Sequence, residues 1–328
     1  MDGLLIVDKP AGPTSHDVVA RLRRALREKQ IGHTGTLDPL ATGVLVLVIG
    51  KATRLAKFLS ASDKSYEAVI RFGFATDTAD AQGQPIGEVS ERRASREAID
   101  AALDEFRGTF LQQPPAFSAK KIDGQRSYKL ARAARAKGGH AGPPLQVADA
   151  PRTAHLATPG PPALPAPVSV TAHAIRILSV DGDHVALRVD CSAGFYIRSL
   201  AHDLGQRLGI GAHLAALRRT RSGGFGLDRA VALDVAERDP GALTSALVPL
   251  ADMLPSWPSV VLTDEGVRRV GHGQDIRPID QLSALSSQRS GEPSAVRPFV
   301  RLLDPRGDLL GIAEPTPGGA LHPSVVLM

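Results

Sequence analysis

The segment GHTGTLDPLATG, residues 32–43, has the residue types best suited to chemistry. It places one carboxylate, Asp38, among glycines, small hydroxylated residues and a proline. Gly35 and Gly43 permit positive φ angles or a close backbone approach, and Pro39 fixes the chain just after the acid. The run VLVLVI then follows and would anchor the loop. Such a loop can hold a carboxylate rigidly against a ligand, although an Asx turn within the loop fits the same residues.

The sequence offers no sign of a cofactor or a metal. The Asp38 segment lacks the Gly-Lys-Ser/Thr ending of a phosphate-binding loop and does not match a dinucleotide fingerprint. The single cysteine, Cys191, allows neither an intrachain disulfide nor a multi-cysteine metal site. The ten histidines show no pairing with nearby acids at metal-ligand spacing. We therefore expect neither a cofactor nor a metal.

Positive charge is concentrated in two segments. The net charge is only +5, but residues 118–138 contain seven cations against one acid, Asp123. A second cluster comprises Arg218, Arg219 and Arg221. Each cluster alone fits a solvated basic face equally well. Two clusters beside aromatic residues, in a chain otherwise close to neutral, favour contacts with phosphates of a polyanion.

Six segments resemble, in order, motifs of the bacterial tRNA pseudouridine-55 synthases. They are DKPAGPTSHDVV (8–19), GHTGTLDPLATGVL (32–45), KSYEA (64–68), PPAFSAKKIDGQRSYKLAR (114–132), CSAGFYIRSLAHDLG (191–205) and GAHLAALRRTRSG (211–223). The resemblance runs from about Leu4 to Leu250 and is interrupted by a proline-rich stretch. Because all six segments occur in the family's order, chance similarity is improbable.

The resemblance implies an isomerase that converts a uridine of the tRNA T-loop, uridine 55, into pseudouridine without a cofactor. The glycosidic C–N bond breaks, the base turns in its pocket and a C–C bond forms. Asp38 matches the catalytic aspartate, which either adds to the uracil ring or acts at the ribose. Arg198 matches its ion-pair partner, because a carboxylate in a closed pocket needs a nearby cation to stay ionised.

The same resemblance supplies the residues that would hold the substrate. A uridine stacked in RNA must be extruded to be reached, and extruded bases are held on aromatic faces. Tyr66 matches the tyrosine that stacks on the base, Tyr196 a second pocket tyrosine and Leu217 an apolar pocket wall. His33 matches a histidine that supports the RNA after extrusion. If Tyr196 and Arg198 lie on a strand, their two-residue spacing places them on one face.

Several further residues fall within the matching motifs. We interpret Ser15 as the N-cap of a helix. The predicted contacts to RNA phosphates are Lys9, Lys120, Lys121, Arg218 and Arg219.

The elements that must position these residues can be predicted from apolar spacing. Strands are expected at 4–8, 44–49 and 66–74, and a hairpin is expected around Asp181-Gly182-Asp183. Helices are expected from Ser15 to about Lys29, after a Ser95 cap, and over 198–209. Strands and helices alternate irregularly, without a βαβ repeat, which predicts an α+β fold with a mainly antiparallel sheet. The resemblance identifies this as the pseudouridine-synthase fold.

Composition also divides the chain. Residues 1–250 are expected to form the catalytic domain, and residues 255–328 a small β-rich RNA-binding module. Within the first part, residues 138–167 are rich in proline and glycine and predict a mobile surface loop. Residues 281–294 are serine-rich and predict a second loop.

Alternatives to the stand-alone enzyme remain at this point. A related catalytic subunit of a guide-RNA pseudouridylation particle shares the aspartate motif but normally carries long basic tails, whereas this chain ends on SVVLM. A non-catalytic RNA-binding or tRNA-folding protein would share the basic clusters without needing Asp38 beside Arg198. A hydrolase with Asp38 as nucleophile has no partner acid in a suitable motif. We expect a cytoplasmic monomer that acts on tRNA, with neither a membrane nor an obligate protein partner.

Overall fold

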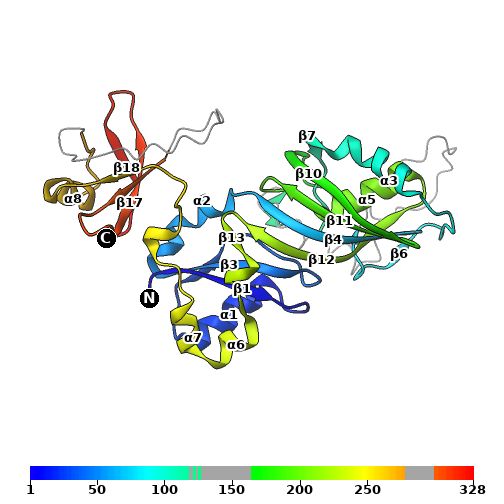
Figure 1. Cartoon of the computed structure of the whole chain (residues 1–328), viewed down its shortest axis with the longest axis horizontal. Coiled ribbons are helices and arrows are strands. Elements are labelled where there is room, and N and C mark those ends of the chain that lie inside the picture. Colours follow the sequence, from blue (N-terminus) through cyan, green and yellow to red (C-terminus); the bar gives the residue numbers. More distant parts are fainter. Residues whose placement is uncertain (118–120, 123–124, 127–163, 278–298) are drawn as a thin grey trace.

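The computed structural model describes residues 1–117, 121–122, 125–126, 164–277 and 299–328. Its centre is a ten-stranded sheet in the order β14-β1-β3-β12-β4-β11-β10-β7, with β2 beside β3 and β13 beside β12. Strands β1 and β14 pair in parallel, as do β3 and β12, and the other pairs are antiparallel (Figure 1). The mainly antiparallel α+β sheet predicted from the sequence is confirmed.

The strands of this sheet span the chain up to Ala232. Their bounds are β1 Gly3–Lys9, β2 Ile31–His33, β3 Thr42–Ile49, β4 Lys64–Phe72, β7 Gly108–Gln112, β10 Val168–Asp181, β11 His184–Cys191, β12 Ala212–Ser222, β13 Phe225–Gly226 and β14 Val231–Ala232. Two short ladders lie apart from it, β5 Ala75–Thr76 with β6 Pro85–Ile86 and β8 Lys121–Ile122 with β9 Gln125–Arg126.

The sheet is covered differently on its two faces. Helices α1 (Ser15–Ala25), α3 (Arg96–Leu103), α5 (Ile197–Leu208) and α6 (Leu233–Arg238) pack on the face that carries Leu5 and Val7. The opposite face carries Leu4 and Ile6 and packs against α2 (Ala56–Ser60) and the preceding turn Gly50–Leu55. Strand β3 is buried along almost its whole length because both of its faces are covered.

The helix starts follow local capping chemistry. Ser95 caps α3 as predicted, since its hydroxyl accepts from Ala98 N. The prediction of Ser15 as a cap is wrong: Thr14 caps α1 and forms a capping box with Asp17, and Ser15 is the first helical residue. Helix α1 also ends at Ala25, short of the predicted Lys29. Helix α5 ends at Gly209, whose φ of +66° provides the left-handed cap.

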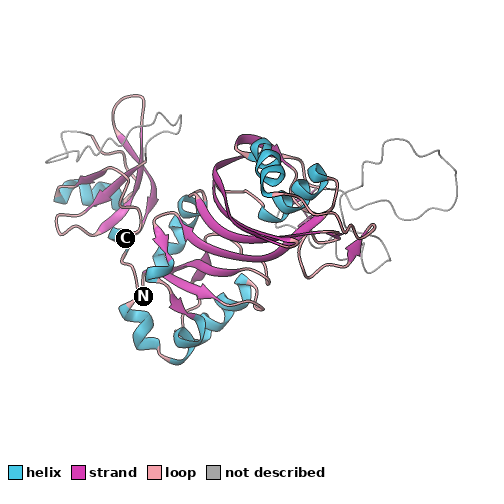
Figure 2. Cartoon of the chain, turned by 45° about the vertical axis from the view of Figure 1, so that its right-hand side comes forward, coloured by secondary structure: helices cyan, strands magenta, loops and turns pink. Residues whose placement is uncertain are grey.

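A second, four-stranded sheet follows the central one. Its strands are β15 Ser259–Val261, β16 Val300–Leu303, β17 Leu309–Pro315 and β18 Leu321–Val326, with helix α8 Asp264–Gly271 against it. Helix α7, Pro240–Ser245, precedes this part. Figure 2 shows this second sheet beside the central one. Phe58 of α2 makes edge contacts with the stacked rings of Trp257 and Phe299, which tie the second sheet to the central one.

Some predictions fall wholly or largely outside the described residues. They are the second loop, 281–294, and the first loop, 138–167, up to residue 163. In the described part of the chain, no helix is both long enough and apolar enough to cross a membrane.

Candidate active site

A cavity of about 250 Å³ opens between the Asp38 loop, strands β4 and β12, and the start of α5. Five of the six residues predicted for catalysis and base binding line it: Asp38, Tyr66, Tyr196, Arg198 and Leu217. Asp38 and Arg198, which are 160 positions apart in the sequence, therefore lie at one site. His33 is the exception. It lies on β2, with its ring 5.2 Å from that of His16, and does not line the cavity.

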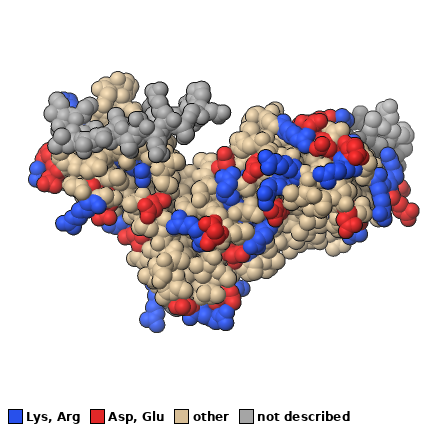
Figure 3. Space-filling model, viewed as in Figure 1, with Lys and Arg blue, Asp and Glu red and all other residues tan. Residues whose placement is uncertain are grey.

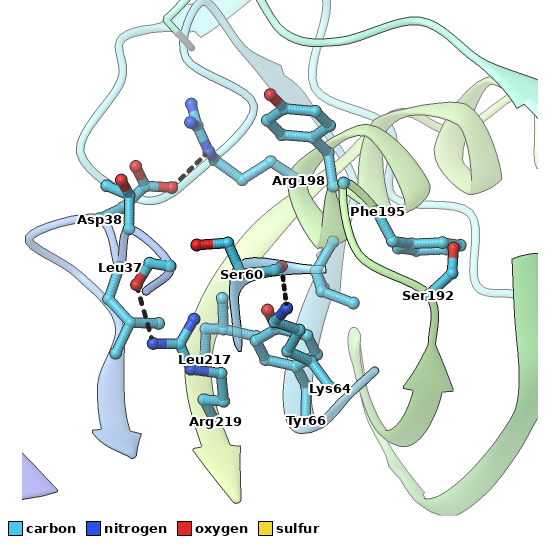
Figure 4. Close-up of a pocket in the computed structure, with 15 residues that line it drawn as sticks. Leu37, Asp38, Ser60, Lys64, Tyr66, Ser192, Phe195, Arg198, Leu217 and Arg219 are labelled. Atoms are coloured by element: carbon cyan, nitrogen blue, oxygen red, sulfur yellow. Dashed lines mark hydrogen bonds and ion pairs between the residues drawn. The ribbon is translucent and has the colours of Figure 1, made fainter. Parts of the chain in front are cut away.

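Asp38 and Arg198 form the expected ion pair at this cavity (Figure 4). Arg198 Nε lies 2.9 Å from Asp38 Oδ2, and the arginine side chain is only 6% exposed against 38% for the aspartate. The guanidinium also donates to the carbonyls of Thr78, at 3.1 Å, and Phe117, at 2.7 Å. Because these carbonyls fix the cation, it holds Asp38 in one place while the carboxylate stays open to the cavity.

Asp80 is a residue of this group that the sequence reasoning missed. Its Oδ2 lies 3.8 Å from Arg198 Nε, so the arginine stands between two carboxylates. Asp80 is buried, and its Oδ1 accepts from Thr78 Oγ1 and Gln82 N. Asp80 lies in the segment TDTADAQG, residues 76–83, where two acids among small residues are the signal that the sequence offers.

Three side chains hold the Asp38 loop through hydrogen bonds to its backbone. Ser15 Oγ accepts from Leu37 N at 2.8 Å and donates to Leu37 O at 3.1 Å, next to Asp38. Lys9 Nζ donates to Ala41 O at 2.6 Å and Pro10 O at 2.9 Å. Arg219 donates to Gly35 O at 3.0 Å and Val44 O at 2.7 Å. The loop is fixed by buried hydrogen bonds to its backbone.

These positions correct two of the predicted phosphate contacts. Lys9 is fully buried, and burial lowers the pKa of its ammonium to about 8. Arg219 is 2% exposed. Neither side chain lies on the surface along which an RNA backbone would run, and Arg219 faces the cavity instead. Both cations donate to backbone carbonyl groups.

The glycines of the loop also serve close packing. Gly43 has φ +97°, and a Cβ there would lie 2.2 Å from Arg219 O of the paired strand β12. Any other residue would push β3 away from β12 and displace the loop that carries Asp38.

The remaining predicted phosphate contacts have different outcomes. Arg218 forms an ion pair with Asp8, at 2.7 Å, and its side chain is 40% exposed, so its phosphate contact stays a prediction. The side chains of Lys120 and Lys121 lie outside the described residues. On the face drawn in Figure 3, Lys and Arg are interspersed with Asp and Glu.

The two pocket tyrosines are held by different elements. Tyr66 lies on β4, directly opposite Arg219 of β12. Burial raises the pKa of its hydroxyl, and the charge of Arg219 partly offsets that rise. Tyr196 immediately precedes α5, so its spacing from Arg198 belongs to a helix start, and the condition that both lie on a strand is not met. The buried amide of Gln112 exchanges two hydrogen bonds with the Tyr196 backbone, at 2.8 and 3.0 Å.

The other lining residues include two further cations, Arg219 and Lys64, and no role was assigned to Lys64 from the sequence. Leu217 lies on β12, where its carbonyl accepts from Thr42 Oγ1, and it supplies an apolar side of the cavity. Among the described residues, no group of three or more His, Cys, Asp or Glu is placed to hold a metal ion.

Solved structures with this fold are RNA-modifying assemblies. An H/ACA ribonucleoprotein bound to a substrate RNA containing 2′-deoxyuridine matches 99% of this chain and 85% of its own, with a TM-score of 0.68 at 24% identity. A Cbf5-Nop10-Gar1 complex matches the same shares with a TM-score of 0.66 at 26% identity. The chain therefore has the fold of the pseudouridine synthases.

Matches to protein-family models and to curated relatives identify the family within the pseudouridine synthases. Residues 23–139 match the model "TruB family pseudouridylate synthase (N terminal domain)", residues 198–254 match "tRNA pseudouridylate synthase B C-terminal domain", and residues 258–327 match "Pseudouridine synthase II TruB, C-terminal". The tRNA pseudouridine synthase B of Solibacter usitatus is 41% identical over the full length of both chains. That of Mycobacterium avium is 46% identical over 71% of this chain and 68% of its own. The chain belongs to the TruB family of pseudouridylate synthases, which confirms the resemblance, the fold and the enzyme class predicted from the sequence.

Proposed function

We propose that this protein isomerises uridine 55 in the T-loop of tRNA to pseudouridine, with Asp38 as the catalytic carboxylate. The observation that carries the proposal is the Asp38–Arg198 pair beside a cavity lined by Tyr66, Tyr196 and Leu217. The relatives named tRNA pseudouridine synthase B, at 41% and 46% identity, support tRNA as the substrate.

The cavity suits one extruded base. Its volume of about 250 Å³ lies below the ~300–1,000 Å³ typical of pockets for drug-sized ligands. Tyr66 offers an aromatic face on one side and Leu217 an apolar surface on another, which together favour a flat heterocycle. The ribose of such a nucleotide would lie toward the carboxylate.

Asp38 supplies a negative charge at a fixed place. Arg198, itself fixed by carbonyls, keeps that carboxylate oriented before the substrate arrives, so little reorganisation is needed during the reaction. The carboxylate acts either at the ribose C1′ or by addition to the uracil ring. In both routes it must be ionised and close to the glycosidic bond.

Two alternatives are less well supported. The catalytic subunit of a guide-RNA particle shares the fold, but the matching guide-RNA assemblies are 24% and 26% identical, well below the tRNA synthases. A protein that only binds or folds tRNA would not need the Asp38–Arg198 pair. We infer that the protein works on tRNA in the cytoplasm as a monomer.

The test is incubation with unmodified tRNA transcript, followed by mapping of pseudouridine by carbodiimide modification and reverse transcription. Wild type should modify position 55, and Asp38→Asn should leave no turnover above background while still binding tRNA. Asp183→Asn, in the exposed hairpin turn and paired with Arg71, is the matched control and should keep wild-type activity. Turnover by Asp38→Asn would refute the assignment of this carboxylate.

A further inference from the structure

Two buried cations line the cavity on the side away from the Asp38–Arg198 pair. They are Lys64 and Arg219, drawn in Figure 4 with Tyr66. Within the described part of the chain, neither forms an ion pair within 4.0 Å. The nearby carboxylate of Asp63 is half-exposed, pairs with His173 and raises the pKa of Lys64 only in part. Two buried cations without an ion-pair partner are costly.

Lys64 lies two residues before Tyr66 on β4, and its Nζ donates to Ser60 O at 2.7 Å and to Ser62 O. Burial, together with the charge of Arg219, lowers the pKa of this ammonium to about 8. The nearby thiol of Cys191 does not offset the charge, because burial raises its pKa to about 12 and keeps it neutral.

Arg219 is the cross-strand neighbour of Tyr66. A base stacked on Tyr66 would therefore lie between the two cations on one side and Asp38 on the other. Arg198 faces two carboxylates, Asp38 and Asp80, whereas Lys64 and Arg219 form no ion pair with a carboxylate among the described residues.

We propose that Lys64 and Arg219 stabilise the negative charge that the uracil ring acquires during isomerisation. The inference rests on the proposed function and adds two residues to its chemistry. Since Coulombic attraction acts over distance, it persists while the base turns between its two attachments. A hydrogen bond of fixed direction would oppose that rotation.

The charge arises in both routes open to Asp38. In the ribose route the C1′–N1 bond breaks with its electron pair on N1, and an Asp38 oxygen supplies a pair to C1′. After rotation C5 attacks C1′ and releases the carboxylate, H5 leaves as a proton and N1 gains one. In the ring route the carboxylate adds to C6, and the π pair of C5=C6 moves onto C4–O4. Either way the ring becomes anionic beside Tyr66.

The test compares uridine with 5-fluorouridine at the target position. Fluorine withdraws electron density, so the anionic ring needs less help from the pocket. Single-turnover rates are measured as loss of the original nucleoside after nuclease digestion, for wild type and Lys64→Gln, which keeps a donor for Ser60 O but loses the charge. Removing a preorganised electrostatic group typically costs ~10²–10³ in rate. We expect a loss of about 100-fold on uridine and less than about 10-fold on 5-fluorouridine.

Lys9→Gln is the matched control. It removes another buried lysine with a pKa lowered to about 8, held by backbone carbonyls but outside the cavity lining. Its loss of rate comes from a displaced Asp38 loop and should be equal on both substrates. Lys64→Arg, which keeps the charge, should retain the wild-type ratio of the two rates.

Equal losses on both substrates for Lys64→Gln, or no loss on either, would overturn the inference. If Lys64→Gln lacks a native melting transition, the rates on uridine and 5-fluorouridine are compared for Arg219→Gln instead. A larger loss on uridine supports the inference, and equal losses or no loss overturn it. A wild-type protein that forms no pseudouridine would instead refute the proposed function, so the two failures are distinguishable.

Discussion

The two sides of the cavity treat buried charge differently. On one side Arg198 stands between two carboxylates, Asp38 and Asp80, and its remaining contacts are to carbonyls. On the other side Lys64 and Arg219 donate to backbone carbonyls, and Arg219 also interacts with the Tyr66 hydroxyl. The first arrangement fixes a charge that is present before the reaction. The second fits a charge that appears only during it. Electrostatic catalysis requires charged groups that are already in place before the reaction, both the reacting carboxylate and the cations that face the developing charge.

The largest expected effect comes from removing the cation of the Asp38–Arg198 ion pair. Arg198→Met should lower the single-turnover rate by about 100-fold or more, because losing one member of a buried ion pair costs ~3–5 kcal/mol. Arg198→Lys should lose less, yet remain impaired, since an ammonium cannot reach Asp38 and both carbonyls in the same planar geometry. The measurement is the rate on tRNA transcript at saturating enzyme.

Arg188→Met is the control for that experiment. Arg188 pairs with Glu67 at 2.6 Å on an exposed part of the sheet, with 47% of its side chain accessible. Exposed pairs contribute only ~0–1 kcal/mol, so this variant should stay within a few-fold of wild type. An Arg198→Met enzyme as active as Arg188→Met would show that Asp38 needs no cation.

The contrast also explains what the sequence could and could not predict. Local patterns identified the β10–β11 hairpin, the Ser95 cap and the buried run of β3, because apolar spacing and turn residues act over a few positions. The Asp38–Arg198 pair was predictable only through the resemblance of two distant motifs. Lys9 and Arg219 were misassigned because a cation in the sequence carries no mark of burial. Both side chains are buried because β3 pairs with β1 and with β12. The hydrogen bond from Arg219 to Val44 O joins residues 175 positions apart.

The same reasoning makes Ser15 a test of how the loop is held. Ser15→Ala would leave Leu37 N and Leu37 O without their buried partner, and each such group costs ~1–3 kcal/mol. We expect a loss of about 2 kcal/mol in the free energy of unfolding and a rate about 10-fold lower, because Asp38 is the next residue. Urea denaturation and single-turnover rates measure the two effects.

Thr14→Ala provides the comparison within the same helix. It removes the N-cap of α1, which typically costs ~1 kcal/mol, without touching the Asp38 loop. Its stability should fall while its rate stays within a few-fold of wild type. If both variants lose activity in proportion to stability, Ser15 has no positioning role of its own.

The last expected effect concerns Lys64, on the side of the two unpaired cations, and is a dependence of the free energy of unfolding on pH. The pKa of Lys64 is about 8 in the folded protein, against an ordinary lysine pKa of 10.5 in the unfolded chain, so between these values the unfolded chain binds more protons. Stability therefore rises with pH across this window, and the cost of burying the ammonium is fully present below pH 8. Between pH 7 and pH 9.5, the free energy of unfolding of wild type should increase relative to Lys64→Met by about 2 kcal/mol. Urea titrations at the two pH values measure this difference, and Lys29→Met, at an exposed position, should show none. A constant difference between wild type and Lys64→Met would mean that Lys64 keeps an ordinary affinity for its proton, and that the charge on this side of the cavity is compensated.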